Sequence, residues 1–249
     1  VHRHEIPLIV DEAHGAHFRF SEYFPVSAAE LGADVVVQSF HKTLPSMTQT
    51  AVLHVCSDMV DVGKIKRFMG IYQTSSPSYI LMASMDACMD KLQKDGKQMF
   101  REFTYNLEKA RQRLSKCEKI KLIEASMLQG TGIYDYDRSK LLFSTVGTSI
   151  NGHQLHEILR DRYHIEMEME AEKYALGIAA VGDTEEGFDR ICSAIEEIDA
   201  ETELVSVAEE SQENTSHARM KQLMTISKAV DAQQRRYPLE ESIGKVSAE

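Results

Sequence analysis

The order of apolar runs in the first part of the chain constrains its fold more than any other feature of the sequence. Two short apolar runs lie at residues 6–10 and 33–38, and a polar residue follows each of them. Residues 27–31 between them have the composition of a short helix, and Gly32 is a typical helix terminator. Two strands that are apolar on both faces, joined by a crossover helix, indicate a parallel α/β sheet.

A third apolar run, at residues 50–55, follows the second after a gap that is too short for a crossover helix. We therefore expect this strand to be antiparallel to its neighbour. The ends of the first two strands, at Asp11 and Ser39, are the positions of functional interest, because ligands of open α/β sheets bind at the carboxyl ends of the strands.

The pattern becomes helical further along the chain. Ser76 and Pro77 suit the start of a helix, and a second helix is expected over residues 97–116. Short strands and helices then alternate, which predicts a small α+β domain. Its expected elements are strands at 121–125, 141–145, 163–169 and 174–181, a helix at 154–162 and a last helix capped by Asp183 and Thr184.

The predicted domain organisation has three parts. Residues 1–117 form the C-terminal part of a large α/β domain, and residues 118–200 form the small α+β domain. Residues 201–249 comprise a linker and the start of a C-terminal domain, because residues 201–216 are acidic and polar without a sustained period. A charged helix from His217 to about Gln234 is expected after this linker.

Charge and composition exclude several classes of protein. The 249 residues include 28 Lys and Arg against 39 Asp and Glu, a net charge of -11 that argues against binding along nucleic-acid phosphates. No apolar run approaches the roughly 20 residues that cross a bilayer, and no secretory signal opens the sequence. The four cysteines are far apart, as buried thiols in a reducing compartment would be. We therefore expect a cytoplasmic protein that binds neither nucleic acid nor membrane.

One lysine occupies an unusual position for its residue type. Lys42 follows the end of a buried strand between polar neighbours, where such an amine can form a Schiff base with a carbonyl compound. Asp11 ends the neighbouring strand, and a carboxylate paired with a reactive lysine is what pyridoxal phosphate requires. Ser39 and His41 offer donors for the phosphate. The alternative is an exposed loop lysine near an aspartate that caps a turn.

Four histidines near the N-terminus raise the question of a zinc site. They are His2, His4, His14 and His17. No third protein ligand with standard spacing accompanies the last pair, so no metal is predicted. The sequence also lacks a G-x-S-x-G motif, which leaves a serine hydrolase without support.

Three segments together carry a resemblance to a known family. They read VDEAHGAHFRF, GADVVVQSFHKTLPSMTQTAVLH and YQTSSPSYILMASMD. The sequence resembles the pyridoxal-phosphate-dependent ornithine/lysine/arginine decarboxylases, which have the aspartate-aminotransferase-like fold, also called PLP fold type I. The similarity continues through LLFSTVGTSINGHQLHEILRDRYHIEMEME and GIAAVGDTEEGFDRI into the closing residues. It implies that residues 1–117 belong to the PLP-binding large domain.

The resemblance implies a role for each residue that matches the family motif. Lys42 matches the lysine that forms the internal aldimine, and Asp11 matches the aspartate that pairs with the pyridinium nitrogen. Ala13 matches the small residue against the ring face. Ser39 and His41 match residues around the phosphate, and His41 is a second candidate proton donor beside Lys42.

Four further residues are implied less directly. His14 lies in the motif near the cofactor. Thr74 and Ser75 resemble a segment that approaches the phosphate from the neighbouring subunit, which implies a homodimer or higher oligomer. Glu168 matches a small-domain carboxylate that binds substrate, the alternative being a solvated strand residue.

The implied activity is decarboxylation of ornithine, lysine or arginine to a polyamine precursor. Family members begin before this sequence and continue beyond it, so we expect an internal fragment that lacks both ends. Two alternatives stay open. One is another PLP fold type I enzyme, such as an aminotransferase, and the other is a non-catalytic fragment or interaction module.

Overall fold

In the computed structural model, the three apolar runs form a sheet in the order β1-β2-β3. Strand β1 (Ile9–Asp11) pairs in parallel with β2 (Val35–Ser39), and β3 (Ala51–Val55) pairs with β2 in the antiparallel direction. Both predicted pairings are confirmed. The chain leaves β1 and β2 at the same edge of the sheet, so Asp11 and the residues after Ser39 lie near each other.

The structure describes residues 1–205, 223–233 and 235–245. The chain divides into two units, Val1–Ser206 and Val207–Glu249. The second unit contains α6 (Ile226–Asp231) and a 3-10 turn at Leu239–Glu241. Most of the predicted linker and the first part of the predicted helix from His217 lie outside the described residues. None of the described helices is long and apolar enough to cross a membrane.

Residues 28–32 form a turn, so the predicted helix at 27–31 is wrong. Their hydrogen bonds are those of one turn, with Leu31 N donating to Ser27 O at 3.0 Å. The Glu12 side chain accepts hydrogen bonds from the Ser27 hydroxyl at 2.8 Å and from Ala28 N at 2.7 Å. These bonds hold the turn in place, and no second helical turn follows it. Gly32 follows at a positive φ of 91°, which favours glycine.

Two helices differ from the prediction. Helix α2 (Val62–Tyr72), with Asp61 as its N-cap, was not predicted. Helix α3 (Tyr79–Leu114) is continuous where two helices were expected, and its N-cap is Ser78. A break near Gly96 does not occur, because this glycine is buried and helical, and a glycine inside a helix costs only about 1 kcal/mol.

The second sheet is antiparallel, in the order β4-β5-β7-β6. Its strands are β4 (Lys121–Leu122), β5 (Lys140–Ser144), β6 (Met169–Ala171) and β7 (Tyr174–Ile178). The predicted strand at 163–169 is mostly wrong, because helix α4 (Gly152–Tyr163) continues to Tyr163 and ends at His164 in the left-handed region. Helix α5 (Glu185–Glu201) begins after Thr184, whose side chain caps it as predicted. Short helical turns complete the first unit at His2–His4, Phe18–Phe20, Phe40–Thr43 (α1) and Ala125–Leu128.

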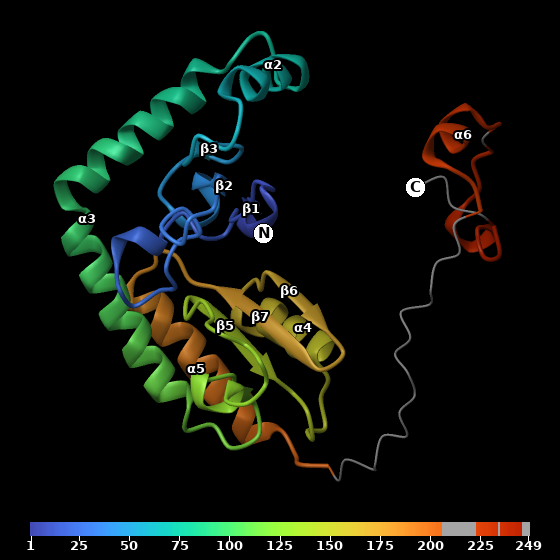
Figure 1. Cartoon of the computed structure of the whole chain (residues 1–249). Helices are drawn as coiled ribbons and strands as arrows, with labels where there is room; N and C mark the ends of the chain where they lie inside the picture. The colour runs from blue at the N-terminus through green and yellow to red at the C-terminus, as the bar shows by residue number, and fades with distance from the viewer. Residues whose placement is uncertain (206–222, 234, 246–249) are drawn as a thin grey trace. The chain divides into compact units, whose positions relative to one another are not determined.

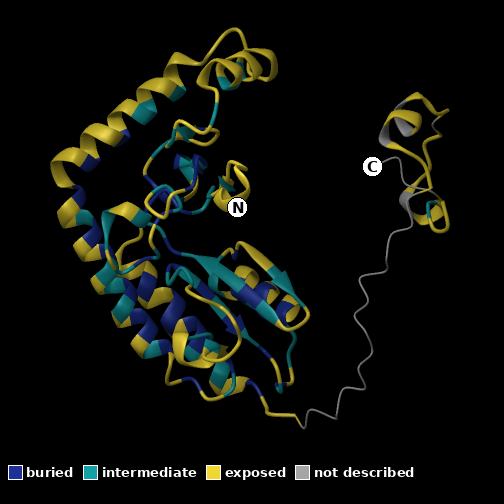
Figure 2. Cartoon of the chain, in the orientation of Figure 1, coloured by how far each residue is buried: buried dark blue, intermediate teal, exposed yellow. Residues whose placement is uncertain are grey.

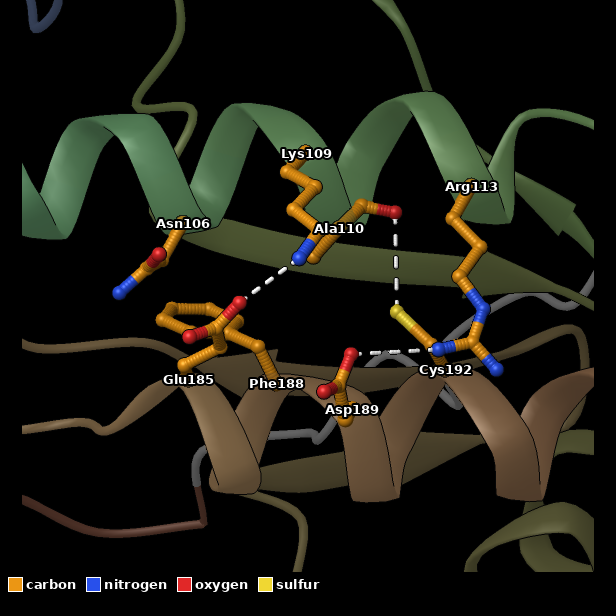
Figure 3. A pocket seen from close by; sticks show the side chains of 8 residues that line it. All are labelled: Asn106, Lys109, Ala110, Arg113, Glu185, Phe188, Asp189 and Cys192. Carbon is orange, nitrogen blue, oxygen red and sulfur yellow. Dashed lines mark hydrogen bonds and ion pairs between the residues drawn. The ribbon is translucent and has the colours of Figure 1, made fainter.

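Burial is concentrated where the second half of α3 meets α5 and the second sheet (Figure 2). Figure 1 shows α5 lying alongside this half of α3. Ion pairs border their contact, with Lys109 Nζ 2.7 Å from Glu185 and Arg113 3.3 Å from Asp189. A cavity of about 60 Å³ lies between the two helices (Figure 3). Burial raises the pKa of the Cys192 thiol in its wall to about 11, so this thiol is held in the unreactive form.

We predict that Leu107→Ala lowers the free energy of unfolding by about 2–5 kcal/mol, because the truncated side chain leaves a cavity in this core. Leu107 is 0% exposed. The matched control is Tyr105→Ala on the same helix, where the side chain is 67% exposed and we expect a change within about 0.5 kcal/mol. Urea denaturation followed by circular dichroism measures both; equal losses would contradict the assignment of the core.

Candidate functional site

A surface depression of about 570 Å³ lies at the carboxyl end of β1. Its size falls within the range of cofactor sites, about 300–1,000 Å³. Residues from the first sheet and from the start of β5 line it: Asp11, Glu12, Ala13, His14, Gly15, Phe18, Lys42, Asp137 and Lys140. The depression therefore lies where an open α/β sheet binds its ligand.

Lys42 and His14 contact each other in this depression. The Nζ atom of Lys42, in α1, lies 3.0 Å from Nε2 of His14. Lys42 is exposed and not desolvated, which differs from the environment expected for a reactive lysine. Burial and the positive charges of Lys42 and Lys140 lower the pKa of His14, against the opposing charges of Glu168 and Asp137. The imidazole of His14 is therefore uncharged at neutral pH.

Asp11 and Ala13 have the positions that a ring with a protonated nitrogen needs. Asp11 is the last residue of β1, and its Oδ1 accepts a hydrogen bond from Ala13 N at 3.0 Å. This bond orients the exposed carboxylate at the rim of the depression, and its second oxygen has no other hydrogen bond among the described residues. Ala13 contributes little bulk to the wall, which leaves space for a flat ligand.

Ser39 and His41 do not line the depression in the single chain. Ser39 N donates to the carbonyl oxygen of Ala13 at 3.3 Å, which holds the two strand ends together. The Nδ1 atom of His41 lies 3.0 Å from the carbonyl oxygen of Thr50 and donates to it, so this nitrogen is engaged with the main chain. The predicted phosphate contacts of both residues stay predictions.

The remaining predicted residues differ in their relation to the depression. Thr74 and Ser75 lie in the exposed connection between α2 and α3 and do not line it. Their predicted contact with a neighbouring subunit stays a prediction. Glu168 is exposed directly before β6, and its main-chain N–H donates to Leu176 O at 2.8 Å. Its negative charge raises the pKa of His14, but Glu168 itself does not line the depression.

The sequence analysis did not identify the part of the site at the start of β5. The Asp137 carboxylate accepts from the Ser139 hydroxyl at 2.7 Å, from Ser139 N at 2.9 Å and from Lys140 Nζ at 2.9 Å. The fourth contact is with Nε2 of the buried His17, at 3.4 Å and 120 residues away in sequence. No motif joins segments so far apart, and the sequence carries no spacing signal for this group.

These contacts determine the charge of Asp137. Burial opposes ionisation, but the hydrogen bonds and positive charges of His17 and Lys140 outweigh it and hold the pKa of Asp137 well below its ordinary value. Asp137 is therefore a carboxylate at neutral pH, and its oxygens are occupied by protein donors. It fixes the position of Lys140, whose side chain is 20% exposed and lines the depression.

The residues present fit pyridoxal phosphate at the reacting end of the cofactor. The depression offers an amine at Lys42, a carboxylate at Asp11 and the small Ala13. It also contains a buried polar atom, Nδ1 of His14, that has no hydrogen-bond partner among the described residues. By contrast, the described residues include no group of three or more His, Cys, Asp or Glu side chains that could hold a metal ion.

The sequence of the chain is similar to those of known proteins. The model of a family described as Orn/Lys/Arg decarboxylase, major domain, matches residues 1–176. An arginine decarboxylase of Bacillus subtilis (strain 168) is 31% identical over 256 residues, which cover 100% of this chain and 51% of the relative. The chain thus spans about half the length of this curated relative.

Two solved structures are similar in fold. Lysine decarboxylase A from Pseudomonas aeruginosa superimposes with a TM-score of 0.62 and 18% identity, over 78% of this chain and 33% of the other. Alanine–glyoxylate aminotransferase from Nostoc sp. gives a TM-score of 0.53 and 15% identity, over 77% of this chain and 53% of the other. These likenesses confirm the predicted aspartate-aminotransferase-like fold class.

We predict that Gly15→Ala destabilises the chain by about 1–3 kcal/mol, because the added methyl group has no space. A Cβ at Gly15 would collide with Glu12 Cγ and lie 2.8 Å from the Phe18 ring, and hydrogen bonds hold Glu12 in place. The control is Gly70→Ala in α2, where nothing lies within 4 Å and a gain of about 0.5–1 kcal/mol is expected. Chemical denaturation compares the two variants; an unchanged Gly15→Ala would contradict the close packing.

We also predict that Asp137→Asn costs about 1–3 kcal/mol at pH 7, because it removes an acceptor from Lys140. The folded-state pKa of Asp137 is depressed, so this stability is present above the unfolded pKa of about 3.9 and is lost as the pH falls below it. The difference between wild type and Asp137→Asn should therefore shrink below about pH 4. Asp86→Asn, at an exposed position of α3, is the control. A difference that stays constant with pH would contradict the assigned charge.

Proposed function

The chain belongs to the Orn/Lys/Arg decarboxylase family, and from this premise we propose that it carries part of the active site of a pyridoxal-phosphate-dependent decarboxylase of basic amino acids. The observation that supports this proposal is the position of the Lys42 amine. It lies in one depression with the carboxylate of Asp11 and contacts His14 at 3.0 Å. A reactive amine and a carboxylate at neighbouring strand ends are the two groups that this cofactor requires.

The chain's residues divide the work of this reaction. When bound, pyridoxal phosphate supplies an electron sink for the electrons of the breaking carbon–carbon bond. The Lys42 amine would hold the cofactor and would supply a proton to the substrate carbon. The Asp11 carboxylate would keep a proton on the ring nitrogen. Ala13 would leave space for the ring, and Ser39 and His41 are the proposed donors to the phosphate. Carbon dioxide and an amine that retains the basic side chain leave the site.

The proposed substrate is ornithine, lysine or arginine, and its product is a polyamine precursor. A relative with 31% identity is named arginine decarboxylase, and a structural neighbour is named lysine decarboxylase. Glu168 offers a carboxylate for the cationic end of such a substrate, and the net charge of -11 attracts cations. We place this reaction in the cytoplasm.

We further propose that the active unit is a homodimer or higher oligomer. Thr74 and Ser75 lie outside the depression of their own chain, so a second chain is needed to bring them to a phosphate. Helix α2 next to them carries exposed apolar side chains, with Phe68 at 46% and Ile71 at 59% exposure. Burial of such surface is a general source of subunit affinity.

We predict that pyridoxal phosphate followed by borohydride reduction modifies Lys42 alone, as mapped by peptide mass spectrometry. Lys42→Ala should lose both the adduct and the release of carbon dioxide from the three basic amino acids. Lys94→Ala, on the exposed face of α3, should retain both and serves as the control. Labelling that scatters over the lysines, or a keto acid in place of an amine product, would contradict the proposed reaction.

A further inference from the structure

His14 contacts the reactive amine and shares a depression with charged residues at the start of β5. Its Nε2 atom is 3.0 Å from Lys42 Nζ, and its ring lines the depression together with Asp137 and Lys140. His41, the other histidine beside Lys42, donates to the main chain of Thr50 and does not line the depression. Of these two histidines, His14 has the geometry to exchange a proton with Lys42.

We propose that His14 is the acid–base partner of Lys42, and that Lys140, which Asp137 holds in the wall of the same depression, is a positioning residue that acts on this proton exchange through His14. This inference rests on the proposed function, in which Lys42 is the reactive amine. It goes beyond that function because it assigns the proton transfer to one ring nitrogen and its control to a residue of the second sheet.

The contact with Lys42 determines the tautomer of His14. An ammonium group has only donors, so Nε2 is the acceptor in this hydrogen bond. A neutral imidazole then carries its hydrogen on Nδ1, which is buried and has no partner among the described residues. The lone pair of Nε2 therefore points at the amine from which a proton must leave.

One proton moves in the proposed step. As Lys42 becomes a nucleophile, one of its N–H bonds breaks and an N–H bond forms at Nε2 of His14. Lys42 retains the electron pair, His14 becomes an imidazolium ion, and the reverse step returns the proton when Lys42 is released. A general base must be uncharged before it acts, so a neutral His14 is the competent form.

Lys140 holds its position through Asp137. Its Nζ lies 2.9 Å from Asp137 Oδ2, and Asp137 is in turn fixed by Ser139 and His17. The cation therefore stays in the wall of the depression, where its charge disfavours protonation of His14. The charged groups that face His14 or line the same depression are Asp11, Glu12, Lys42, Asp137, Lys140 and Glu168.

Two members of this charge set act on His14 in opposite directions. The charge of Lys140 lowers the pKa of His14, and the charge of Glu168 raises it. Lys140→Met must therefore shift the titration of His14 to higher pH, and Glu168→Gln must shift it to lower pH. A histidine with only a structural role would not show this pair of opposite shifts in catalysis.

The first measurement is an NMR titration of the His14 ring in the full chain, without cofactor, with His14→Gln to assign its signals. We expect the wild-type pKa below 6.5, an upward shift of about half a pH unit in Lys140→Met, and a downward shift in Glu168→Gln. If Lys140→Met fails to fold, Glu168→Gln, changed at an exposed position, still tests the direction. A His14 titration that neither variant moves would overturn the role of Lys140.

The second measurement is the pH dependence of kcat/KM for decarboxylation. The acid limb should follow the His14 titration, move with the two charge variants and disappear in His14→Gln. His153→Gln, a half-exposed histidine of α4 outside the depression, should leave the limb unchanged. A limb that persists in His14→Gln would overturn the acid–base role. A borohydride adduct on lysines other than Lys42 would instead overturn the proposed function, while the NMR measurement still decides whether Lys140 acts on His14.

Discussion

The carboxylate of Asp137 is the interaction on which the site depends. It binds Lys140 at 2.9 Å and the buried His17 at 3.4 Å, and so joins the loop after β1 to the start of β5. Burial of a carboxylate is costly unless donors surround it, and here Ser139 supplies two more. The Ser139 hydroxyl also lies 3.4 Å from His17 Nε2, so this group joins the two segments through more than one polar contact.

Helix α3 contacts the segment around Asp137 through a buried side chain. Arg111 is buried, and its guanidinium donates to the carbonyl oxygens of Arg138 and Lys140 at 2.9 Å and 3.4 Å. The same side chain lies 3.0 Å from Glu124, which compensates its charge. Arg111 thus connects the core formed by α3, α5 and the second sheet to the segment that carries Asp137. The stability of this core holds Asp137 in place.

In this site the reactive group, the Lys42 amine, is exposed and surrounded by charged side chains. Lys42 is exposed, so its chemistry depends on its neighbours and not on desolvation. His14 provides the neighbour within hydrogen-bond distance, and Lys140 provides a second positive charge in the same wall. The carboxylates of Asp11, Glu12 and Asp137 line the same depression as these cations. A cluster of two amines, one imidazole and three carboxylates can hold a bound carbonyl compound and move a proton nearby.

The sequence alone determined the parallel strands, the positions of Asp11 and Lys42 at their ends, and the family, because these depend on local patterns of apolar residues and on short motifs. It did not reveal that α3 is continuous through Gly96, because tertiary burial overrides the low helix propensity of one glycine. Only the tertiary structure brought Asp137 and Lys140 to His14. Contacts between residues 120 positions apart, such as His17 and Asp137, arise from how two sheets pack, and no periodicity in the chain encodes them.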